Sequence, residues 1–596
     1  MLRRVGAPCL IFAAAFLTFL PALNADFVDS WDDYDNVVNN TGVHGLRAAQ
    51  LRWMWTGTVG GHWIPLTWMS FGLNYALDGV NPRGYHLLNL LLHAAGATVF
   101  FFIVRRLLRA AGSAAAESDL SVGAAFAALL FAVHPLRVES VVWVTERKDV
   151  LCGFFFMLAV LAYLRAAGGA TLRRGWTYAS LAATAAALLS KAAALPLPAV
   201  LLLLDVYPLG RVRIIGWRRC LLEKLPWAAV AAIGAFIALR VVLMGNMVTG
   251  YETYGPGSRV AMTAYTFSFY PARWLWPLRL IPLYELPVEV HLLAPRFLIP
   301  ALAFVAVTAL LFALRRIFPA GLAAWTLSVL MLLPISGIVH SGHQLAHDRY
   351  SYLSGLGFAA LAGGGLTRLL DARSRGRVSA VIAGSMLAGA AAVLLVLAVG
   401  AWDQSKIWQD SETLWRWSVN MDPDCSVCWN NLGTSVSAHN RHPEAEEAFR
   451  KAFALRPKRA TLASNIGISL YRQMKVREAE EMLHLALSLD RNDTRALASL
   501  GAVYSQQRKY AEALPMYRQA FAQDPGFGTL APNYLLALVA RAAEERSAGR
   551  ALVAKALLQE ALVVNPGDAE ARRQLQALLA EGDSAGAGPA RPRPSR

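Results

Sequence analysis

Long apolar runs separated by short arginine clusters fill the first 400 residues of this 596-residue chain. A helix of about 20 apolar residues is long enough to cross a bilayer. The pattern predicts an all-α fold, with a polytopic membrane domain of about eleven transmembrane helices over residues 1–400. The apolar runs centre on residues 8–23, 85–104, 120–134, 150–165, 176–190, 193–207, 226–245, 297–314, 321–339, 352–367 and 379–400.

Basic residues are concentrated in this apolar half. The whole chain has 57 Lys and Arg against 40 Asp and Glu, a net charge of +17. Of these, 32 basic and 18 acidic residues precede residue 400. Such excess charge can mark a nucleic-acid-binding surface. Arginine clusters between apolar runs instead indicate cytoplasmic loops. We therefore expect no nucleic-acid partner, a cytoplasmic N terminus, and the second half of the chain outside the cytoplasm.

One segment does not fit a simple count of spans. Residues 262–282 are long enough to cross, but they contain two arginines, three prolines and several aromatic residues. Trp, Tyr and Arg suit the headgroup zone of a bilayer. We therefore predict an interfacial or re-entrant element here.

An acidic cluster opens the first predicted outer loop, residues 24–84. Five aspartates lie within ten residues: Asp26, Asp29, Asp32, Asp33 and Asp35. Carboxylates this close repel one another and raise some of their pKa values, which suits a general base or a bound cation. A solvated acidic loop is the alternative interpretation. His62 and Arg83, later in the same loop, are candidate substrate-binding residues.

Further ionisable residues fall at other predicted outer boundaries. They are His134, Glu139, Glu146, Arg147, Lys148 and Asp149 in one segment, Lys191 in a turn, and Asp348 and Arg349 in another. Ionisable groups are costly at a membrane boundary unless they are paired or used. Such cations would suit a lipid phosphate. His340, His343 and His347 match the spacing of a zinc site only loosely, so we predict no metal.

Beyond residue 400 a 34-residue repeat begins. Gly433, Gly467 and Gly501 are spaced by 34 residues, as are Ala445, Ala479 and Ala513. This period, in segments that read as helix pairs, is a tetratricopeptide signature. We predict a repeat domain over residues 401–580, with a partial leading helix at 411–423, repeats near 429–460, 463–494 and 497–528, a divergent repeat at 531–567, and a disordered tail at 581–596.

Repeat arrays of this kind leave a concave surface that binds proteins or peptides. Cys425 and Cys428 lie at the start of a predicted repeat helix. Outside the cytoplasm, a local disulfide or simple packing explains the pair better than redox catalysis does.

The motifs and their order resemble a known family. FVDSWDDYDN, PLTWMSFGLNYALDG, HPLRVESVVWVTERKDVL, LLSK and DRYSYL precede the repeats. Together they resemble the transmembrane and tetratricopeptide repeat-containing O-mannosyltransferases and their bacterial relatives. The resemblance implies a GT-C fold, a bacterial inner membrane, a polyprenyl-phosphate-linked sugar as donor, a protein hydroxyl as acceptor, and no required cofactor.

The resemblance also implies residue roles. Asp32 and Asp33 correspond to the family's paired acidic motif, with Asp33 preferred as the base and Glu139 assigned to orienting it or the sugar. Inverting transfer would follow, with the leaving phosphate stabilised by Arg147, Lys148 or Arg349. Lys191 is assigned to the same phosphate site. His62, Arg83 and His134 remain candidates for substrate binding.

Two other functions compete with this one. The chain could be a non-enzymatic scaffold whose repeats recruit an envelope assembly, or an enzyme that acts on lipid-linked glycans. A scaffold needs anchoring spans but no clustered Asp, Arg and Lys on one face. The clustering therefore favours an enzyme.

Overall fold

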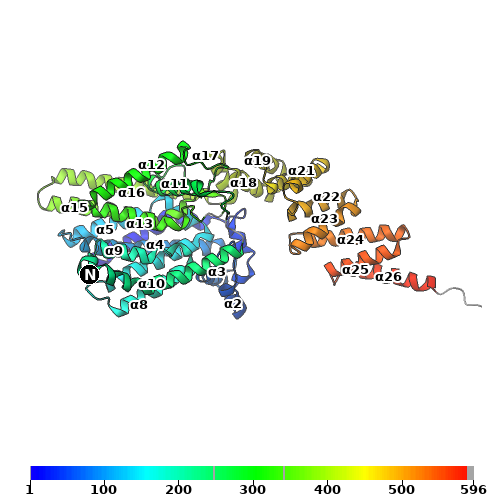
Figure 1. The fold of residues 1–596 in the computed structure, drawn as a ribbon, viewed down its shortest axis with the longest axis horizontal. Coiled ribbons are helices and arrows are strands. Elements are labelled where there is room, and N and C mark those ends of the chain that lie inside the picture. Colours follow the sequence, from blue (N-terminus) through cyan, green and yellow to red (C-terminus); the bar gives the residue numbers. More distant parts are fainter. Residues whose placement is uncertain (1, 246–248, 340–341, 587–596) are drawn as a thin grey trace, which may run out of the picture. The chain divides into compact units, whose positions relative to one another are not determined.

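The computed structural model describes residues 2–245, 249–339 and 342–586, and these are mostly helical (Figure 1). The all-α prediction is confirmed. Two compact units divide the chain, an N-terminal unit, Met1–Pro423, and a C-terminal unit, Asp424–Arg596. The described part has one two-stranded antiparallel sheet, in which β1 (Tyr284–Glu285) pairs with β2 (Gln344–Ala346).

The N-terminal unit contains the following α-helices: α1 (Leu2–Thr18), α2 (Ala48–Thr56), α3 (Pro65–Asp78), α4 (Pro82–Ala110), α5 (Glu117–Ala132), α6 (Val138–Val142), α7 (Arg147–Ala166), α8 (Arg174–Ser190), α9 (Leu197–Val206), α10 (Arg211–Met244), α11 (Pro256–Leu275), α12 (Pro295–Ala313), α13 (Pro319–Leu332), α14 (Ser351–Ser354), α15 (Leu356–Ser374), α16 (Ala380–Ile407) and α17 (Ser411–Met421). Short 3-10 and π turns connect several of them, including η9 (Asp348–Tyr350).

The expected count of eleven spans is wrong. Within the described residues, five helical segments are long and apolar enough to cross a membrane, and up to seven if each of two bent pairs is one span. The five correspond to α4, α7, α10, α12 and α16. Other apolar runs form shorter helices: α9 has 10 residues and α13 has 14. The apolar runs in the sequence are longer than the helices that they form, because turns and bends interrupt them.

Burial separates these candidate spans into two kinds. In α7, 78% of the apolar window is buried within the protein, whereas in α12 and α16 only 6% is buried. Apolar helices without protein neighbours on most of their surface suit contact with lipid. The amphipathic helix α11, which covers much of the predicted interfacial segment, is not among the candidate spans. Its interfacial placement stays a prediction.

The C-terminal unit is a series of antiparallel helix pairs: α18 (Ser426–Ala438) with α19 (His442–Leu455), α20 (Ala460–Arg472) with α21 (Val476–Leu489), α22 (Thr494–Gln506) with α23 (Tyr510–Gln523), and α24 (Leu530–Ser547) with α25 (Ala551–Val564), followed by α26 (Ala569–Gly586). The spaced glycines allow this packing. A Cβ on Gly501 would lie 2.7 Å from the ring of Tyr517, and one on Gly467 would lie 2.7 Å from Leu483.

Both ends of the repeat domain differ from the boundaries predicted from the sequence. The predicted leading helix, α17, packs within the N-terminal unit, which extends to Pro423. At the other end, α26 continues to Gly586. The rest of the predicted tail, residues 587–596, lies outside the described residues.

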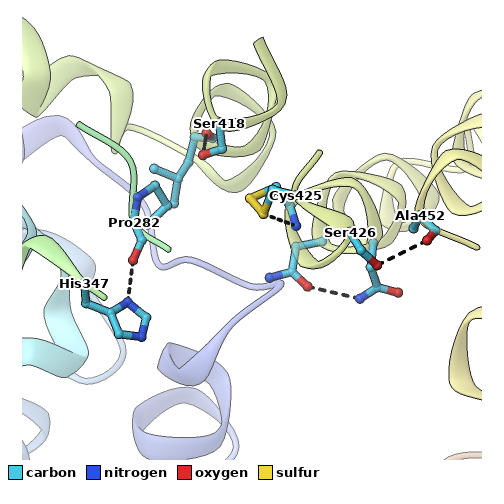
Figure 2. Close-up of a disulfide and its surroundings, with 10 residues drawn as sticks. Pro282, His347, Ser418, Cys425, Ser426 and Ala452 are labelled. Atoms are coloured by element: carbon cyan, nitrogen blue, oxygen red, sulfur yellow. Dashed lines mark hydrogen bonds between the residues drawn. A yellow bond between two sulfur atoms is a disulfide. The ribbon is translucent and has the colours of Figure 1, made fainter. Parts of the chain in front are cut away.

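A disulfide joins Cys425 and Cys428 at the start of α18 (Figure 2). The neighbouring Ser426 hydroxyl donates a hydrogen bond to the Ala452 carbonyl of α19, at 3.2 Å. The cysteine pair and this hydrogen bond therefore fix the first turn of the first repeat.

Candidate active site

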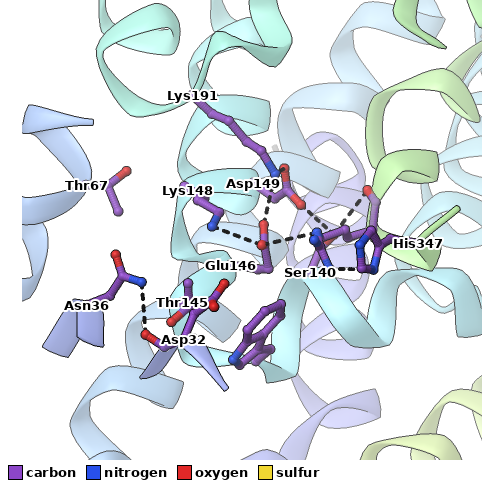
Figure 3. Close-up of polar contacts among 12 residues, drawn as sticks. Asp32, Asn36, Thr67, Ser140, Thr145, Glu146, Lys148, Asp149, Lys191 and His347 are labelled. Carbon is purple, nitrogen blue, oxygen red and sulfur yellow. Dashed lines mark hydrogen bonds and ion pairs between the residues drawn. The ribbon is translucent and has the colours of Figure 1, made fainter. Parts of the chain in front are cut away.

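The buried carboxylate of Glu146 gathers three cations. Its oxygens lie 3.1 Å from Lys148 Nζ, 2.9 Å from Lys191 Nζ and 3.2 Å from Arg349 Nε. Figure 3 shows both lysines pointing toward Glu146. These side chains come from the turn before α7, the first turn of α7, the end of α8 and η9. We call Glu146, Lys148, Lys191 and Arg349 the charged cluster.

Two more carboxylates complete the charge balance. Lys191 Nζ lies 2.6 Å from Asp149 Oδ1, and Arg349 pairs with Glu139, which also accepts a hydrogen bond from the Arg349 backbone N–H at 2.8 Å. Burial alone would lower the pKa of Lys191, but the carboxylates of Asp149 and Glu146 raise it above its ordinary value. Three cations therefore face three carboxylates, and the surrounding carboxylates also raise the pKa of Arg349 against the effect of its burial.

Asp33 of the acidic loop is fully buried and fully bonded. One carboxylate oxygen accepts hydrogen bonds from the Thr145 N–H at 2.8 Å and the Thr145 hydroxyl at 2.6 Å. The other accepts from the Val28 N–H at 2.9 Å. Burial raises the pKa of Asp33 to about 6 against the effect of these hydrogen bonds. Asp33 thus fastens the loop beside the segment that carries Glu146.

Asp32, its neighbour, has a different environment. The residue is partly exposed, and among the described residues its carboxylate makes no hydrogen bond or ion pair. Only its backbone carbonyl is engaged, by the Asn36 side-chain amide at 2.9 Å (Figure 3). Burial raises the pKa of Asp32, while the charges of Lys148 and Arg349 oppose the rise. Asp32 is therefore an uncommitted carboxylate within electrostatic reach of the charged cluster.

Two predicted site residues have structural contacts instead. The guanidinium of Arg147 is buried and donates to Asn89, Ser70, Asn74 and the Tyr85 carbonyl, so it joins α7 to α3 and α4 rather than to the cluster. His134 is also buried. It accepts a hydrogen bond from the Leu136 N–H and contacts the Trp274 carbonyl at 3.0 Å.

The two remaining candidates lie in the first outer loop. His62 is exposed at the protein surface, and the protein around its imidazole, followed by the charges of Lys148 and Lys191, lowers its pKa to about 3. His62 is thus a neutral imidazole near the cluster at pH 7. Arg83 is exposed at the start of α4, and no contact joins it to the cluster within the described residues.

Sequence reasoning missed an aromatic group beside the cluster. Trp31 packs against Trp143 with ring centroids 4.3 Å apart, and against Trp415 of α17 at 5.0 Å. Arg349 lies over the Trp143 ring at 5.3 Å. The tryptophans were visible in the motifs WDDYDN and LWRWS, but no sequence period relates residues almost 400 positions apart.

Hydrogen bonds also attach α17 to the acidic loop. The Trp415 indole N–H donates to the Ser30 hydroxyl at 2.7 Å, and the Ser411 hydroxyl accepts from the Asp29 N–H at 2.9 Å. Close by, the Asp26 N–H donates to the Gln409 carbonyl at 2.8 Å. The segment after the last candidate span therefore holds the loop that carries Asp32.

Metal ligation has no evident site in the part of the chain that the structure describes. There, no group of three or more His, Cys, Asp or Glu side chains is arranged to hold a metal ion. His340, one residue of the loose zinc pattern, lies outside the described residues. The absence of a metal stays a prediction. The cluster's cations are instead suited to an anionic group such as phosphate.

Comparison with known proteins found similarity to a repeat model and to one group of transferases. A family model described as "Tetratricopeptide repeat" matches residues 494–522. Protein O-mannosyl-transferase TMTC4 of Mus musculus is 25% identical over 491 residues, covering 73% of this chain and 64% of that protein. Protein O-mannosyl-transferase TMTC1 of Homo sapiens is 25% identical over 518 residues, covering 77% of this chain and 56% of that protein.

The chain spans less than two thirds of the length of either relative. Among solved structures, the crystal structure of YrrB, a TPR protein with an unusual peptide-binding site, is 19% identical with a TM-score of 0.23, and the match covers 28% of this chain and 81% of that one. The similarity to the two transferases extends over both units of this chain. The chain is therefore similar in sequence to the transmembrane, tetratricopeptide repeat-containing protein O-mannosyl-transferases.

Proposed function

We propose that this protein is an integral-membrane glycosyltransferase of the inverting GT-C type. It moves a sugar, mannose or another hexose, from a polyprenyl phosphate to a protein hydroxyl on the non-cytoplasmic face. The names of its relatives support the reaction class. The observation that carries the site assignment is the unpaired Asp32 carboxylate beside Lys148 and Arg349.

Asp32 acts as the general base in this mechanism. A carboxylate oxygen of Asp32 accepts the proton of the acceptor hydroxyl, whose oxygen attacks C1 of the sugar. The bond between C1 and the phosphate oxygen breaks, its electron pair leaves with polyprenyl phosphate, and the configuration at C1 inverts. The leaving phosphate needs cationic stabilisation rather than a proton. A raised pKa on Asp32 suits this role, because basicity rises with pKa.

Asp32 serves this role better than Asp33. Both oxygens of Asp33 already accept hydrogen bonds, and the residue is 0% exposed. A base must come within hydrogen-bond reach of the proton that it removes. Asp33 then positions Asp32, because the two are adjacent in a loop that Asp33 attaches to Thr145.

Lys148, Lys191 and Arg349 form the phosphate site in this proposal. Lys148 has Glu146 as its one carboxylate partner among the described residues, whereas Lys191 and Arg349 each have a second. Lys148 is therefore the cation with most capacity to turn toward an incoming phosphate. Glu139 holds Arg349 in place. Arg147 is not part of this site, since its donors are occupied elsewhere.

Two independent features support the non-cytoplasmic placement. Arginine clusters lie at the C-terminal ends of α4 and α15, remote from the charged cluster, and such clusters favour the cytoplasm. The Cys425–Cys428 disulfide suits an oxidising compartment. In a bacterium this is the periplasmic side of the inner membrane, where the repeats bind the acceptor protein or a partner.

The test compares two matched Asp→Asn variants of the full chain in vesicles with a mannosyl polyprenyl phosphate donor. Asp32→Asn removes the base and should lower transfer by about 10²–10⁴-fold. Asp35→Asn, in the same loop but exposed, should retain activity. Full activity of the Asp32→Asn protein would contradict the base assignment. If the native protein transfers no sugar from any polyprenyl-phosphate donor, the scaffold function replaces the enzyme.

A further inference from the structure

A second site lies at the other end of the N-terminal unit. A cavity of about 580 Å³ is lined mainly by apolar side chains of α4, α7, α9, α13 and α15. Its lining on α7 begins at Phe156, eight residues after Lys148, or roughly 12 Å along the helix. The volume falls within the usual range for sites of small ligands. The cavity is thus separate from the charged cluster.

Small residues on α15 create the space. A Cβ built on Gly365 would meet nothing within 4 Å, and one on Gly364 would meet only Leu108, at 3.4 Å. Ala323 of α13 and Ala360 of α15 also line the cavity. Gly365 lines the cavity, and a larger side chain there would begin without a clash, so substitution at this position can occupy cavity space.

One cation at the rim is uncommitted. Arg368 and Arg375 both line the cavity, but Arg375 Nε is paired with Asp371 at 3.0 Å. Arg368 is exposed and makes no hydrogen bond or ion pair within the described residues. An apolar cavity with one free arginine at its edge matches a ligand that has an apolar chain and an anionic head.

The surroundings identify the class of ligand. The end of α15 carries Arg368, Arg373 and Arg375, which by the positive-inside rule face the cytoplasm. The cytoplasmic leaflet is enriched in anionic lipids, and basic pockets between membrane helices on that side bind the headgroups of such lipids. Burying an acyl chain contributes about 0.8 kcal/mol for each CH₂ group.

We propose that this cavity holds one acyl chain of an anionic phospholipid, with the lipid phosphate on Arg368. The lipid fills space between five helices and so stabilises the N-terminal unit. This site is independent of the sugar-transfer chemistry.

The experiment uses the full chain, purified in detergent and stripped of lipid. Thermal unfolding is followed with added phosphatidylglycerol or phosphatidylcholine. Gly365→Leu fills the cavity, and Gly384→Leu on α16 is its control, because a Cβ there also meets nothing within 4 Å. We expect phosphatidylglycerol to raise the Tm of the native and Gly384→Leu proteins, and to lose this effect in Gly365→Leu. Should Gly365→Leu not fold, Ala323→Phe fills the cavity from the opposite wall.

The headgroup contact has its own pair of variants. Arg368→Gln should lower the preference for phosphatidylglycerol over phosphatidylcholine about 5-fold, while Arg373→Gln, outside the cavity lining, should leave it unchanged. An unaltered lipid response in both cavity-filling variants, or in Arg368→Gln, would overturn the proposal. So would mass spectrometry of the purified protein that finds a stoichiometric polyprenyl phosphate, removed by the filling variants, in place of phospholipid.

Discussion

Replacing Glu146 with Gln tests whether the charged cluster depends on its central carboxylate. Glu146 is 0% exposed and lies within 3.2 Å of three cations. Its removal leaves the buried Lys148 without a carboxylate partner in the described part of the chain. Removing one member of a buried ion pair lowers the free energy of unfolding by about 3–5 kcal/mol. We therefore expect Glu146→Gln to lower the free energy of unfolding by about that amount.

This free energy corresponds to a measurable change in Tm. Unfolding entropy near 2.1 cal/mol/K per residue gives roughly 0.9 kcal/mol/K for the 423 residues of the N-terminal unit. A loss of 3–5 kcal/mol then lowers Tm by roughly 3–6 °C. The assay is thermal unfolding of the full chain in detergent. Glu117→Gln is the control, because Glu117 also pairs with arginines but its side chain is 61% exposed, and exposed pairs contribute at most about 1 kcal/mol.

The effect of added anions on Tm is a second measurement on the Glu146→Gln variant. With Glu146 neutral, the three cations face only the carboxylates of Asp149 and Glu139, and the excess positive charge can be balanced by another anion. Polyprenyl phosphate should therefore raise the Tm of Glu146→Gln more than that of the native protein. A Tm of Glu146→Gln within about 1 °C of the native value, or an equal response of both proteins to polyprenyl phosphate, would refute this reasoning.

Three further predictions concern other contacts. Burial raises the pKa of Asp33 from 3.8 to about 6. Between these pH values the folded state keeps a proton that the unfolded state has released. The resulting stabilisation, about 3 kcal/mol, is present below pH 3.8 and is lost as pH rises through 6. The Tm of Asp33→Asn relative to the native protein should therefore rise between pH 4 and pH 6.5, and parallel Tm curves would contradict the shift. Trp415 is fully buried, so Trp415→Ala should lower the free energy of unfolding by about 3–5 kcal/mol and lower sugar transfer at least 10-fold by releasing the acidic loop. Trp402→Ala on α16, where Trp402 is 38% exposed, should change neither quantity. Native transfer by the Trp415→Ala protein would exclude this coupling. Gly501→Ala should destabilise the C-terminal unit by about 1–3 kcal/mol, because its Cβ would lie 2.7 Å from Tyr517, while Gly526→Ala, whose Cβ would lie 3.5 Å from Asp524, should not; chemical denaturation that finds the two variants equally stable would disprove the packing argument.

The repeats and the helical class were predictable because their signals are local. A period of 34 residues and apolar runs can be read within a single segment. The number of spans was not predictable in this way. Between α5 and the segment Pro135–Val142 the helix axis bends by 57°. Pro135 marks a break in the sequence, but neither it nor the apolar composition fixes how far the axis turns.

The candidate active site also combines features that were predictable from local sequence with features that were not. The sequence by itself determined which ionisable residues interrupt or flank the apolar runs, because charge in an apolar segment stands out without any fold. Only the tertiary structure decided their roles. It turned Arg147 toward Asn74 and Asn89 while Lys148, the next residue, faces Glu146. It also bonded Asp33 fully and left Asp32 uncommitted. Adjacent residues look equivalent in sequence, but their side chains leave the backbone in different directions, and partners over 100 residues away determine which of them stays available for chemistry.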